Sequence, residues 1–245
     1  MICNRCKYSL DKREFHIKQR ICKRCHALRR YGFDSRREFD LLIKSQAGIC
    51  PICFEGFEKR KCVVDHDHKT GAVRSALHDS CNLAVGYVEN LGVPKGRINW
   101  YLSKDPVSFP QKSGIEYDSE VIGGNQKCKS CGIFYPIEKF YYVEKDNSRR
   151  KICNKCRTII QVRKLDYSQY QFLMSLQDDC WICLDRTEER FIDHDYNHCY
   201  TRSSCEKCVR GVLCRKCNSF LGHCREDMDI LSQLYLYVNK YGGQH

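Results

Sequence analysis

Residues 50–82 read CPICFEGFEKRKCVVDHDHKTGAVRSALHDSCN, and this stretch decides the fold. It begins with Cys50-Pro-Ile-Cys53 and ends with His78-x2-Cys81, so four metal-binding side chains enclose a short segment. Inside lie a β-branched pair, then Asp65-His66-Asp67, then Val73-Arg74, and Asn82 follows the last cysteine at once. We interpret the segment as a hairpin held by a metal ion, with a small set of polar side chains at one end.

The same order of motifs occurs twice in the chain, which predicts a tandem duplication. Cys50-Pro-Ile-Cys53 recurs as Cys180-Trp-Ile-Cys183, Val64-Asp65-His66-Asp67 as Ile192-Asp193-His194-Asp195, and His78-x2-Cys81-Asn82 as Cys214-x2-Cys217-Asn218. Val73-Arg74 recurs as Val209-Arg210, and the Cys-x2-Cys pairs at positions 3 and 22 recur at positions 128 and 153. The spacing between equivalent residues drifts between 125 and 136, as small loop insertions would produce.

Composition points to metal rather than a large core as the source of stability. Cysteine supplies 20 of the 245 residues, about 8 %, so the hydrophobic share of 42 % falls to about 34 % without it. That share is thin for one large core. The sequence shows no signal-peptide pattern and no apolar run long enough for a membrane span. We therefore expect a cytoplasmic protein whose paired cysteines bind metal instead of forming disulfides.

The formal net charge of +12 is concentrated in two segments. Residues 1–30 hold ten Lys or Arg and two acidic residues, and residues 126–157 hold nine and three. Because each segment also carries two Cys-x2-Cys pairs, we interpret both as basic zinc ribbons that contact phosphate. DNA is the expected partner, and a membrane is not.

Four tetrahedral zinc sites follow from the cysteine spacing. The predicted ligands are Cys3, Cys6, Cys22 and Cys25; Cys50, Cys53, His78 and Cys81; Cys128, Cys131, Cys153 and Cys156; and Cys180, Cys183, Cys214 and Cys217. Four protein ligands close each site, so these sites are expected to be structural. His198, Cys199, Cys205 and Cys208 form a candidate fifth site with looser spacing.

The polar residues within each hairpin suit a metal-dependent phosphodiesterase. Oxygen atoms of an Asp and an Asn are ligands that Mg²⁺ prefers, and a neutral His nearby can take a proton from water. On an ideal strand, however, Asp65 and His66 point to opposite faces, so this chemistry requires a strongly twisted hairpin.

These residues together resemble the recombination endonuclease VII family of phage Holliday-junction resolvases, within the His-Me finger or HNH-like nucleases. The resemblance rests on the Cys50 pair, Val64 to His68, Val73-Arg74 and the closing His78-x2-Cys81-Asn82, and it recurs in the second copy. It implies a ββα-metal fold, one Mg²⁺ per copy (for which Mn²⁺ can substitute) and cleavage of branched DNA. The implied site residues are Asp65, Asn82, Asp193 and Asn218 as Mg²⁺ ligands, His66 and His194 as general bases, and His68, Arg74 and Arg210 as further catalytic residues. The sequence departs from the family pattern at Tyr196, which stands where the first copy has His68.

The predicted fold class is α+β, built of small zinc-stapled modules in tandem. We divide the chain into zinc ribbon 1 (1–30), nuclease module 1 (31–102), a linker (103–125), zinc ribbon 2 (126–157) and nuclease module 2 with a C-terminal helix (158–245). A capping box at Ser35 and Glu38 predicts a helix after ribbon 1. The C-terminal helix, roughly residues 226–241, is amphipathic, and its partner is left open between the second copy and another protomer.

The sequence thus predicts a Mg²⁺-dependent DNA endonuclease, selective for branched or junction DNA, that works as a monomeric pseudo-dimer or a homodimer. Two alternatives remain. One is an HNH homing or nicking endonuclease with a sequence-specific site, and the other is a non-catalytic multi-zinc DNA-binding or regulatory protein.

Overall fold

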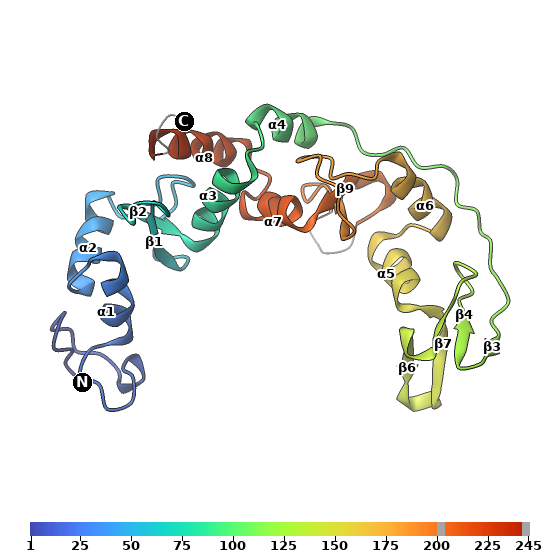
Figure 1. The fold of residues 1–245 in the computed structure, drawn as a ribbon, viewed down its shortest axis with the longest axis horizontal. Coiled ribbons are helices and arrows are strands. Elements are labelled where there is room, and N and C mark those ends of the chain that lie inside the picture. Colours follow the sequence, from blue (N-terminus) through green and yellow to red (C-terminus); the bar gives the residue numbers. More distant parts are fainter. Residues whose placement is uncertain (200–203, 242–245) are drawn as a thin grey trace. The chain divides into compact units, whose positions relative to one another are not determined.

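The computed structural model describes residues 1–199 and 204–241, in which short helices alternate with small antiparallel sheets (Figure 1). The α-helices are α1 (Lys23–Leu28), α2 (Arg36–Ser45), α3 (Asp79–Leu91), α4 (Lys95–Ser103), α5 (Asn154–Arg163), α6 (Tyr167–Leu176), α7 (Arg215–His223) and α8 (Met228–Tyr241). The strands are β1 (Cys62–His66), β2 (Val73–His78), β3 (Val121–Ile122), β4 (Asn125–Lys127), β5 (Phe134–Pro136), β6 (Phe140–Val143), β7 (Ser148–Cys153), β8 (Arg190–His194) and β9 (Val209–Cys214). Short 3-10 helices lie at Lys12–Glu14, Arg29–Tyr31, Ile137–Lys139, Glu144–Asp146 and Glu206–Cys208.

The duplication is visible as two ββα units. Strands β1 and β2 pair antiparallel and lead into α3, and strands β8 and β9 pair antiparallel and lead into α7. In both ββα units the second strand ends at a predicted zinc ligand, His78 or Cys214, and the helix begins at the next residue. The second pair of zinc ligands therefore lies where the strand meets the helix. The predicted fold class, small zinc-stapled modules of mixed helix and sheet in tandem, is confirmed.

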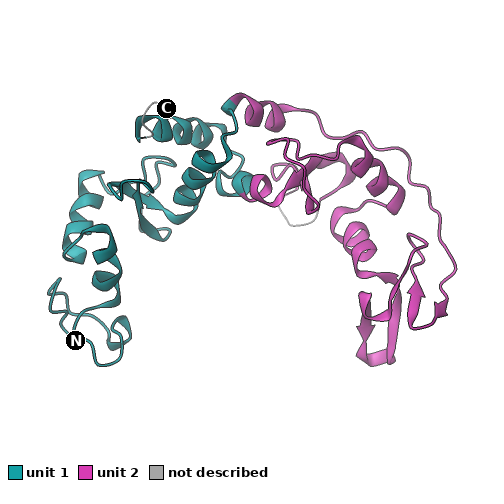
Figure 2. Cartoon of the chain, in the orientation of Figure 1, with its two compact units in different colours: residues 1–95, 220–245 teal, residues 96–219 magenta. Residues whose placement is uncertain are grey.

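The chain divides into two compact units, shown in Figure 2. Unit 1 consists of residues 1–95 and 220–245, and unit 2 consists of residues 96–219. Helix α4, which follows the first ββα unit in sequence, therefore belongs to unit 2, and helix α8, which follows the second, belongs to unit 1. The sequence predicts that α8 packs on the second copy or on another protomer. Helix α8 packs instead against α3 of the first copy.

Among the described residues, apolar burial is divided among several small clusters. In unit 1, Leu28, Phe39, Val64 and Ala76 form one cluster beneath the β1–β2 hairpin. In unit 2, Ile159, Leu165, Leu173, Ile192, Val209 and Val212 form its counterpart. Each zinc ribbon has a further cluster made of its four cysteines and one phenylalanine, Phe15 or Phe140. The thin hydrophobic composition is thus reflected in small cores that depend on their cysteine sites.

Two local expectations from the sequence need comment. Helix α2 begins after Ser35, but the Ser35 side chain does not cap it. Glu38 accepts a hydrogen bond from the backbone nitrogen of Asp34 at 2.9 Å instead of from that of Ser35, so the predicted capping box is not formed. The segment predicted as a linker lies on unit 2: the backbone nitrogen of Val107 donates to Val209 at 2.7 Å, and Phe109 packs on the unit 2 cluster. Among the described residues, no helix is both long and apolar enough to cross a membrane.

Candidate functional site

A β-bulge lies at the turn end of each nuclease-like hairpin. Asp65 pairs with Ser75, but His66 pairs with Val73, so Arg74 is an extra residue on β2. The second hairpin has the same irregularity, since Asp193 pairs with Gly211 and His194 with Val209. A bulge bends its strand and increases the local twist, so neighbouring side chains need not alternate strictly between faces. The strong twist that the Asp-His sequence requires therefore has a structural source in both copies.

Asp65 is held by the bulged arginine and by a tyrosine. Arg74 donates from Nε to Oδ2 at 2.8 Å and from Nη2 to Oδ1 at 2.9 Å, and the two side chains are 4 % and 2 % exposed. The Tyr237 hydroxyl donates to Oδ2 of Asp65 at 2.6 Å, and Arg74 also contacts Glu89. Burial would lower the pKa of Arg74, but the carboxylates of Asp65 and Glu89 raise it well above its ordinary value. The Asp65 carboxylate is thus fixed in one orientation.

Asp193 has the same surroundings in the second copy. Arg210 donates from Nε to Oδ2 at 2.9 Å, its Nη2 lies 2.9 Å from the same oxygen, and the Tyr101 hydroxyl donates to that oxygen at 2.9 Å. Burial raises the pKa of Tyr101 well above its usual range, and Asp193 raises it further. An aspartate, a bulged arginine and a tyrosine therefore form one constellation that occurs twice.

The two predicted general bases have different neighbours. His66 is half-buried, and its ring lies 5.0 Å from that of Tyr31 and 4.9 Å from that of His68. His194 is only 2 % exposed; its ring lies 4.5 Å from that of Tyr196, and its Nδ1 lies 3.3 Å from Nη1 of Arg163. Burial lowers the pKa of Arg163. The first histidine is thus surrounded by uncharged or titratable rings, and the second faces a guanidinium.

The predicted asparagine ligands lie on the helices that follow the hairpins. Asn82 is in the first turn of α3 and Asn218 is in the first turns of α7, and both are partly buried. Helix α3 packs against both β1 and β2. The structure therefore places Asn82 on the element beside Asp65, although no direct contact joins the two side chains among the described residues.

The third residue of each Asp-His-Asp motif organises the hairpin turn. Asp67 Oδ1 accepts hydrogen bonds from the backbone nitrogens of Lys69 and Thr70 at 2.9 and 2.7 Å, and these bonds, with that of Thr70 first, lower the pKa of Asp67. Asp195 plays the same part by accepting from the Asn197 backbone nitrogen at 2.8 Å. Both residues stabilise the turn locally.

All four predicted zinc sites bring their ligand atoms together. In each set the sulfur and nitrogen atoms lie within 4.8 Å of one another. Individual separations are 4.0 Å between Cys3 and Cys25, 3.8 Å between Cys183 and Cys214, and 3.2 Å between Cys53 Sγ and His78 Nδ1. A tetrahedral ion with Zn–S bonds of about 2.3 Å separates two sulfurs by about 3.8 Å. The donor sets are therefore compatible with zinc, and the candidate fifth set of His198, Cys199, Cys205 and Cys208 meets the same distance limit.

The first knuckle of each predicted zinc site contains a left-handed residue directly after its second cysteine. These residues are Lys7, Phe54, Gly132 and Leu184, with φ between 56° and 71°. Only Gly132 adopts this conformation without steric cost. The repeated turn brings the two sulfurs of each pair toward one point. In three of the four turns the left-handed residue carries a side chain, which disfavours this backbone conformation.

The sequence model of the recombination endonuclease VII family matches residues 23–117 and 155–240. The two ranges contain both hairpins, both asparagine helices, and helices α4 and α8. The chain belongs to the recombination endonuclease VII family. The predicted family and the tandem duplication are thereby confirmed.

One further relative of this endonuclease VII chain is the Gene 59 protein of Mycobacterium phage D29. It is 38 % identical over 78 residues, which are 31 % of this chain and 47 % of that protein. The match therefore spans about half the length of the relative. No solved structure matches the chain.

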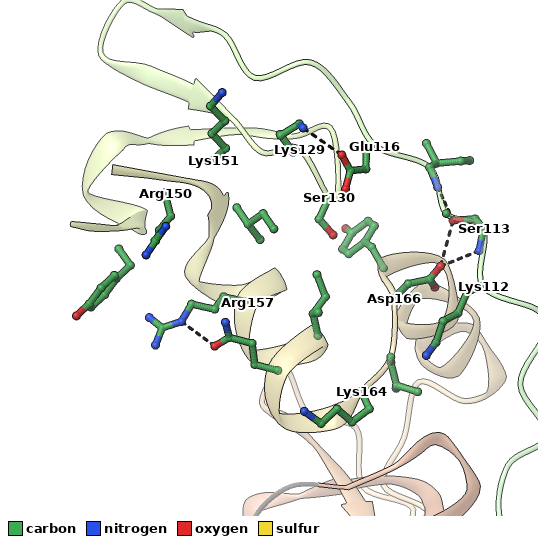
Figure 3. Close-up of a pocket in the computed structure, with 18 of the residues that line it drawn as sticks. Lys112, Ser113, Glu116, Lys129, Ser130, Arg150, Lys151, Arg157, Lys164 and Asp166 are labelled. Carbon is green, nitrogen blue, oxygen red and sulfur yellow. Dashed lines mark hydrogen bonds and ion pairs between the residues drawn. The ribbon is translucent and has the colours of Figure 1, made fainter. Parts of the chain in front are cut away.

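A basic cavity of about 910 Å³ lies in unit 2 of this endonuclease VII family member, between ribbon 2, helix α5 and residues 112–116 (Figure 3). Its basic lining residues are Lys112, Lys129, Arg149, Arg150, Lys151, Arg157 and Lys164. The two acidic lining residues are engaged: Glu116 pairs with Lys129 at 3.0 Å, and Asp166 caps α6 by accepting from Gln169 at 2.8 Å. The cavity is thus strongly cationic.

Sequence reasoning missed the two tyrosines and Arg163. A signal for the tyrosines existed, because Tyr101 and Tyr237 are 136 positions apart, the same spacing that separates Asn82 from Asn218. The repeat of the endonuclease VII pattern therefore continues through α4 and α8. Among the described residues, no cation contacts the His66 ring as Arg163 contacts that of His194, and no periodicity in the sequence marks Arg163.

Proposed function

We propose that this chain is a divalent-metal-dependent DNA endonuclease that cuts branched DNA, with one hydrolytic site in each copy. The observation that carries the proposal is the repeated constellation in two bulged hairpins: a fixed aspartate, an adjacent histidine, and an asparagine on the following helix. Membership of the recombination endonuclease VII family supports DNA as the substrate.

The residues present fit a hard divalent cation. A carboxylate offers about four lone-pair directions. Three of these on Asp65 are taken by Arg74 and Tyr237, and one on Oδ1 is left. On Asp193, within residues 1–199 and 204–241, the contacts of Arg210 and Tyr101 converge on Oδ2 and leave Oδ1 open. With the amide oxygens of Asn82 and Asn218, these atoms form oxygen donor sets that suit Mg²⁺ or Mn²⁺.

Each side chain then has a definite part in hydrolysis. Asp65 and Asn82 would hold the metal, which supplies positive charge against the charge that develops on the phosphate. His66, half-buried at the end of β1, would take the proton from the attacking water, and His68 stacks on its ring. Arg74 acts through Asp65, so we assign Arg74, and likewise Arg210, as positioning residues. Asp193, Asn218 and His194 would have the same parts in the second copy.

The zinc ribbons and the basic cavity would hold the DNA backbone. Ribbon 1 (1–30) and ribbon 2 (126–157) carry the basic excess of the chain. In the cavity, the side chains of Arg150, Lys151 and Lys164 are not paired with an acidic group among the described residues, as Figure 3 shows. Tyr141 and Tyr167 in the lining provide apolar surface beside these charges. Such a lining suits a sugar-phosphate strand, whatever its sequence.

The DNA-holding role is tested by replacing Arg150, Lys151 and Lys164 with alanine. Each lost phosphate contact should reduce the slope of log affinity against log salt by about 0.9. We expect weaker binding of all branched substrates by similar factors and a slope reduced by about 2 to 3. The matched control replaces Lys44, Lys59 and Lys95, which lie outside the cavity, with alanine. Equal slopes for the two triple variants would contradict the assignment.

The catalytic proposal is tested with a His66→Ala, His194→Ala double variant on labelled four-way junctions, forks and linear duplexes, with Mg²⁺ or EDTA. We expect Mg²⁺-dependent cutting of branched DNA by the parent and none by the double variant, with zinc content unchanged. Each single variant should mainly nick, because the two copies would form a pseudo-dimer that cuts one strand each. Cutting at one duplex sequence regardless of branching would indicate a homing or nicking enzyme. Binding without any cutting would indicate a regulatory DNA-binding protein.

A further inference from the structure

The hydroxyl groups that touch the two aspartates come from helices of the opposite copy. Tyr237 is on α8, which follows the second ββα unit, yet its hydroxyl donates to Asp65 at 2.6 Å in unit 1. Tyr101 is on α4, which follows the first ββα unit, yet its hydroxyl donates to Asp193 at 2.9 Å in unit 2. Both rings are almost fully buried, at 6 % and 0 % exposed. The exchange is reciprocal and occurs at the same place in both units.

Packing around each tyrosine holds it against its aspartate. Helix α8 buries Ile230, Leu231 and Leu234 on the face that carries Tyr237, and it packs on α3. The Tyr237 hydroxyl also lies 2.5 Å from Ser75 Oγ, and Ser75 is opposite Asp65 in the hairpin register. In unit 2, the guanidinium of Arg210 lies 5.7 Å from the centre of the Tyr101 ring. In unit 1, that of Arg74 lies 6.0 Å from the centre of the Tyr237 ring. Each tyrosine therefore covers the ion pair of the other copy.

We propose that Tyr237 and Tyr101 are positioning residues that complete the nuclease site of the opposite copy, so that neither hairpin has a fully oriented aspartate without the other copy's terminal helix. This inference rests on the proposed function. The hydroxyl fixes Oδ2 of the aspartate, so that Oδ1 would be the oxygen available to a metal ion. Loss of one hydrogen bond to a carboxylate should weaken the metal complex or slow the cut by roughly 10- to 100-fold.

The test uses Tyr237→Phe and Tyr101→Phe, which remove only the hydroxyl. The cut made by copy one is followed in a His194→Ala background, and the cut made by copy two in a His66→Ala background, on a junction with each strand labelled. We expect Tyr237→Phe to slow the copy-one cut and raise its Mg²⁺ requirement, with the copy-two cut unchanged. Tyr101→Phe should have the reverse effect.

Controls separate positioning from loss of folding. Tyr235→Phe removes a hydroxyl from the same helix that donates to the Val93 carbonyl, and Ser103→Ala removes one from α4 that donates to Asn99. Both controls should leave the two cuts as they are. If Tyr237→Phe is too unstable to purify, Ser75→Ala tests the same contact. This variant removes the serine hydroxyl that is hydrogen-bonded to the Tyr237 hydroxyl beside Asp65.

A second readout does not depend on cleavage. Mn²⁺ alone, titrated into the zinc-loaded full-length chain and followed by electron paramagnetic resonance, should show two sites in the parent and one weakened site in each tyrosine variant. The proposal would be overturned if the tyrosine variants kept the Mn²⁺ affinity of the parent. It would also be overturned if Tyr237→Phe slowed the copy-two cut, or Tyr101→Phe the copy-one cut. A parent that cuts no DNA would defeat the proposed function, while the Mn²⁺ titration would still decide the positioning role.

Discussion

The site proposed in copy two should cut its strand more slowly than the one in copy one, because the two proposed general bases, His194 and His66, have different neighbours. As it takes a proton, the base gains positive charge, and Nδ1 of His194 lies 3.3 Å from Nη1 of Arg163. Burial lowers the pKa of Arg163, but a guanidinium starts so high that it remains charged at neutral pH. The ring of His66 instead lies 5.0 Å from the ring of Tyr31.

The size of the difference follows from the distance. Two unit charges 3.3 Å apart repel by about 5 kcal/mol at an effective dielectric constant of about 20. With the proton about half transferred in the transition state, about 2.5 kcal/mol of that repulsion opposes the reaction, which corresponds to roughly 50- to 100-fold in rate. Removing the charge with Arg163→Gln should recover most of this factor for copy two and leave copy one unchanged.

The assay is single-turnover cleavage of a four-way junction with each strand labelled. His66→Ala leaves only the copy-two cut, and His194→Ala leaves only the copy-one cut, so the ratio of their rates measures the asymmetry. Arg215→Gln, which removes one positive charge from an exposed position in the same unit, is the control for net charge. Equal rates for the two single histidine variants, or no gain in copy two from Arg163→Gln, would refute the reasoning.

Four other outcomes are expected. Zinc release to a chromophoric chelator should rise as the pH falls, because protons compete with the metal for the cysteine thiolates of each predicted site, and release independent of pH would contradict the zinc assignment. Phe54→Gly and Leu184→Gly should strengthen zinc retention by about 0.5–1 kcal/mol. The left-handed backbone conformation costs a residue with a side chain about 1–2 kcal/mol, and relief of this cost exceeds the entropy cost of glycine. Weaker zinc retention by these variants in chelator competition would contradict the strain. Arg74→Met should destabilise unit 1 by about 3–5 kcal/mol in urea unfolding, since it leaves Asp65 buried and unpaired, and a loss below about 1 kcal/mol would show that the pair is dispensable for stability. Elemental analysis should give five zinc ions per chain and four for Cys205→Ser, whereas four in both proteins would leave the fifth cluster without metal.

Features set by short-range spacing were predictable from the sequence. A Cys-x2-Cys pair can supply only two corners of a tetrahedron, so the order of the pairs determined which cysteines would meet, and all sixteen predicted ligands gathered as expected. The hairpins followed from the β-branched residues around Asp65 and Asp193. Short patterns of this kind determine the local structure without contacts from distant parts of the sequence.

Features that depend on long-range packing were not predictable. The amphipathic face of α8 indicates that the helix is buried, but it does not specify which hairpin covers it, and the sequence offered no reason to prefer the first copy. The ion pair between Arg74 and Asp65 depends on the bulge, and a bulge has no signature in a Val-Arg dipeptide. Ser35 does not cap α2, and Glu38 accepts from the backbone nitrogen of Asp34 instead of that of Ser35, a shift of one residue that the capping-box pattern does not reveal.

The exchange of helices also sets the order in which the two sites can mature during synthesis. Asp65 and Tyr237 are 172 residues apart, whereas Asp193 and Tyr101 are 92 apart. During synthesis the first hairpin emerges from the ribosome long before its tyrosine, whereas Tyr101 has already been made when the second hairpin emerges. A nascent chain that ends between the second hairpin and Tyr237 would therefore hold Asp65 without its hydroxyl partner, so the constellation of unit 1 can form only after that of unit 2.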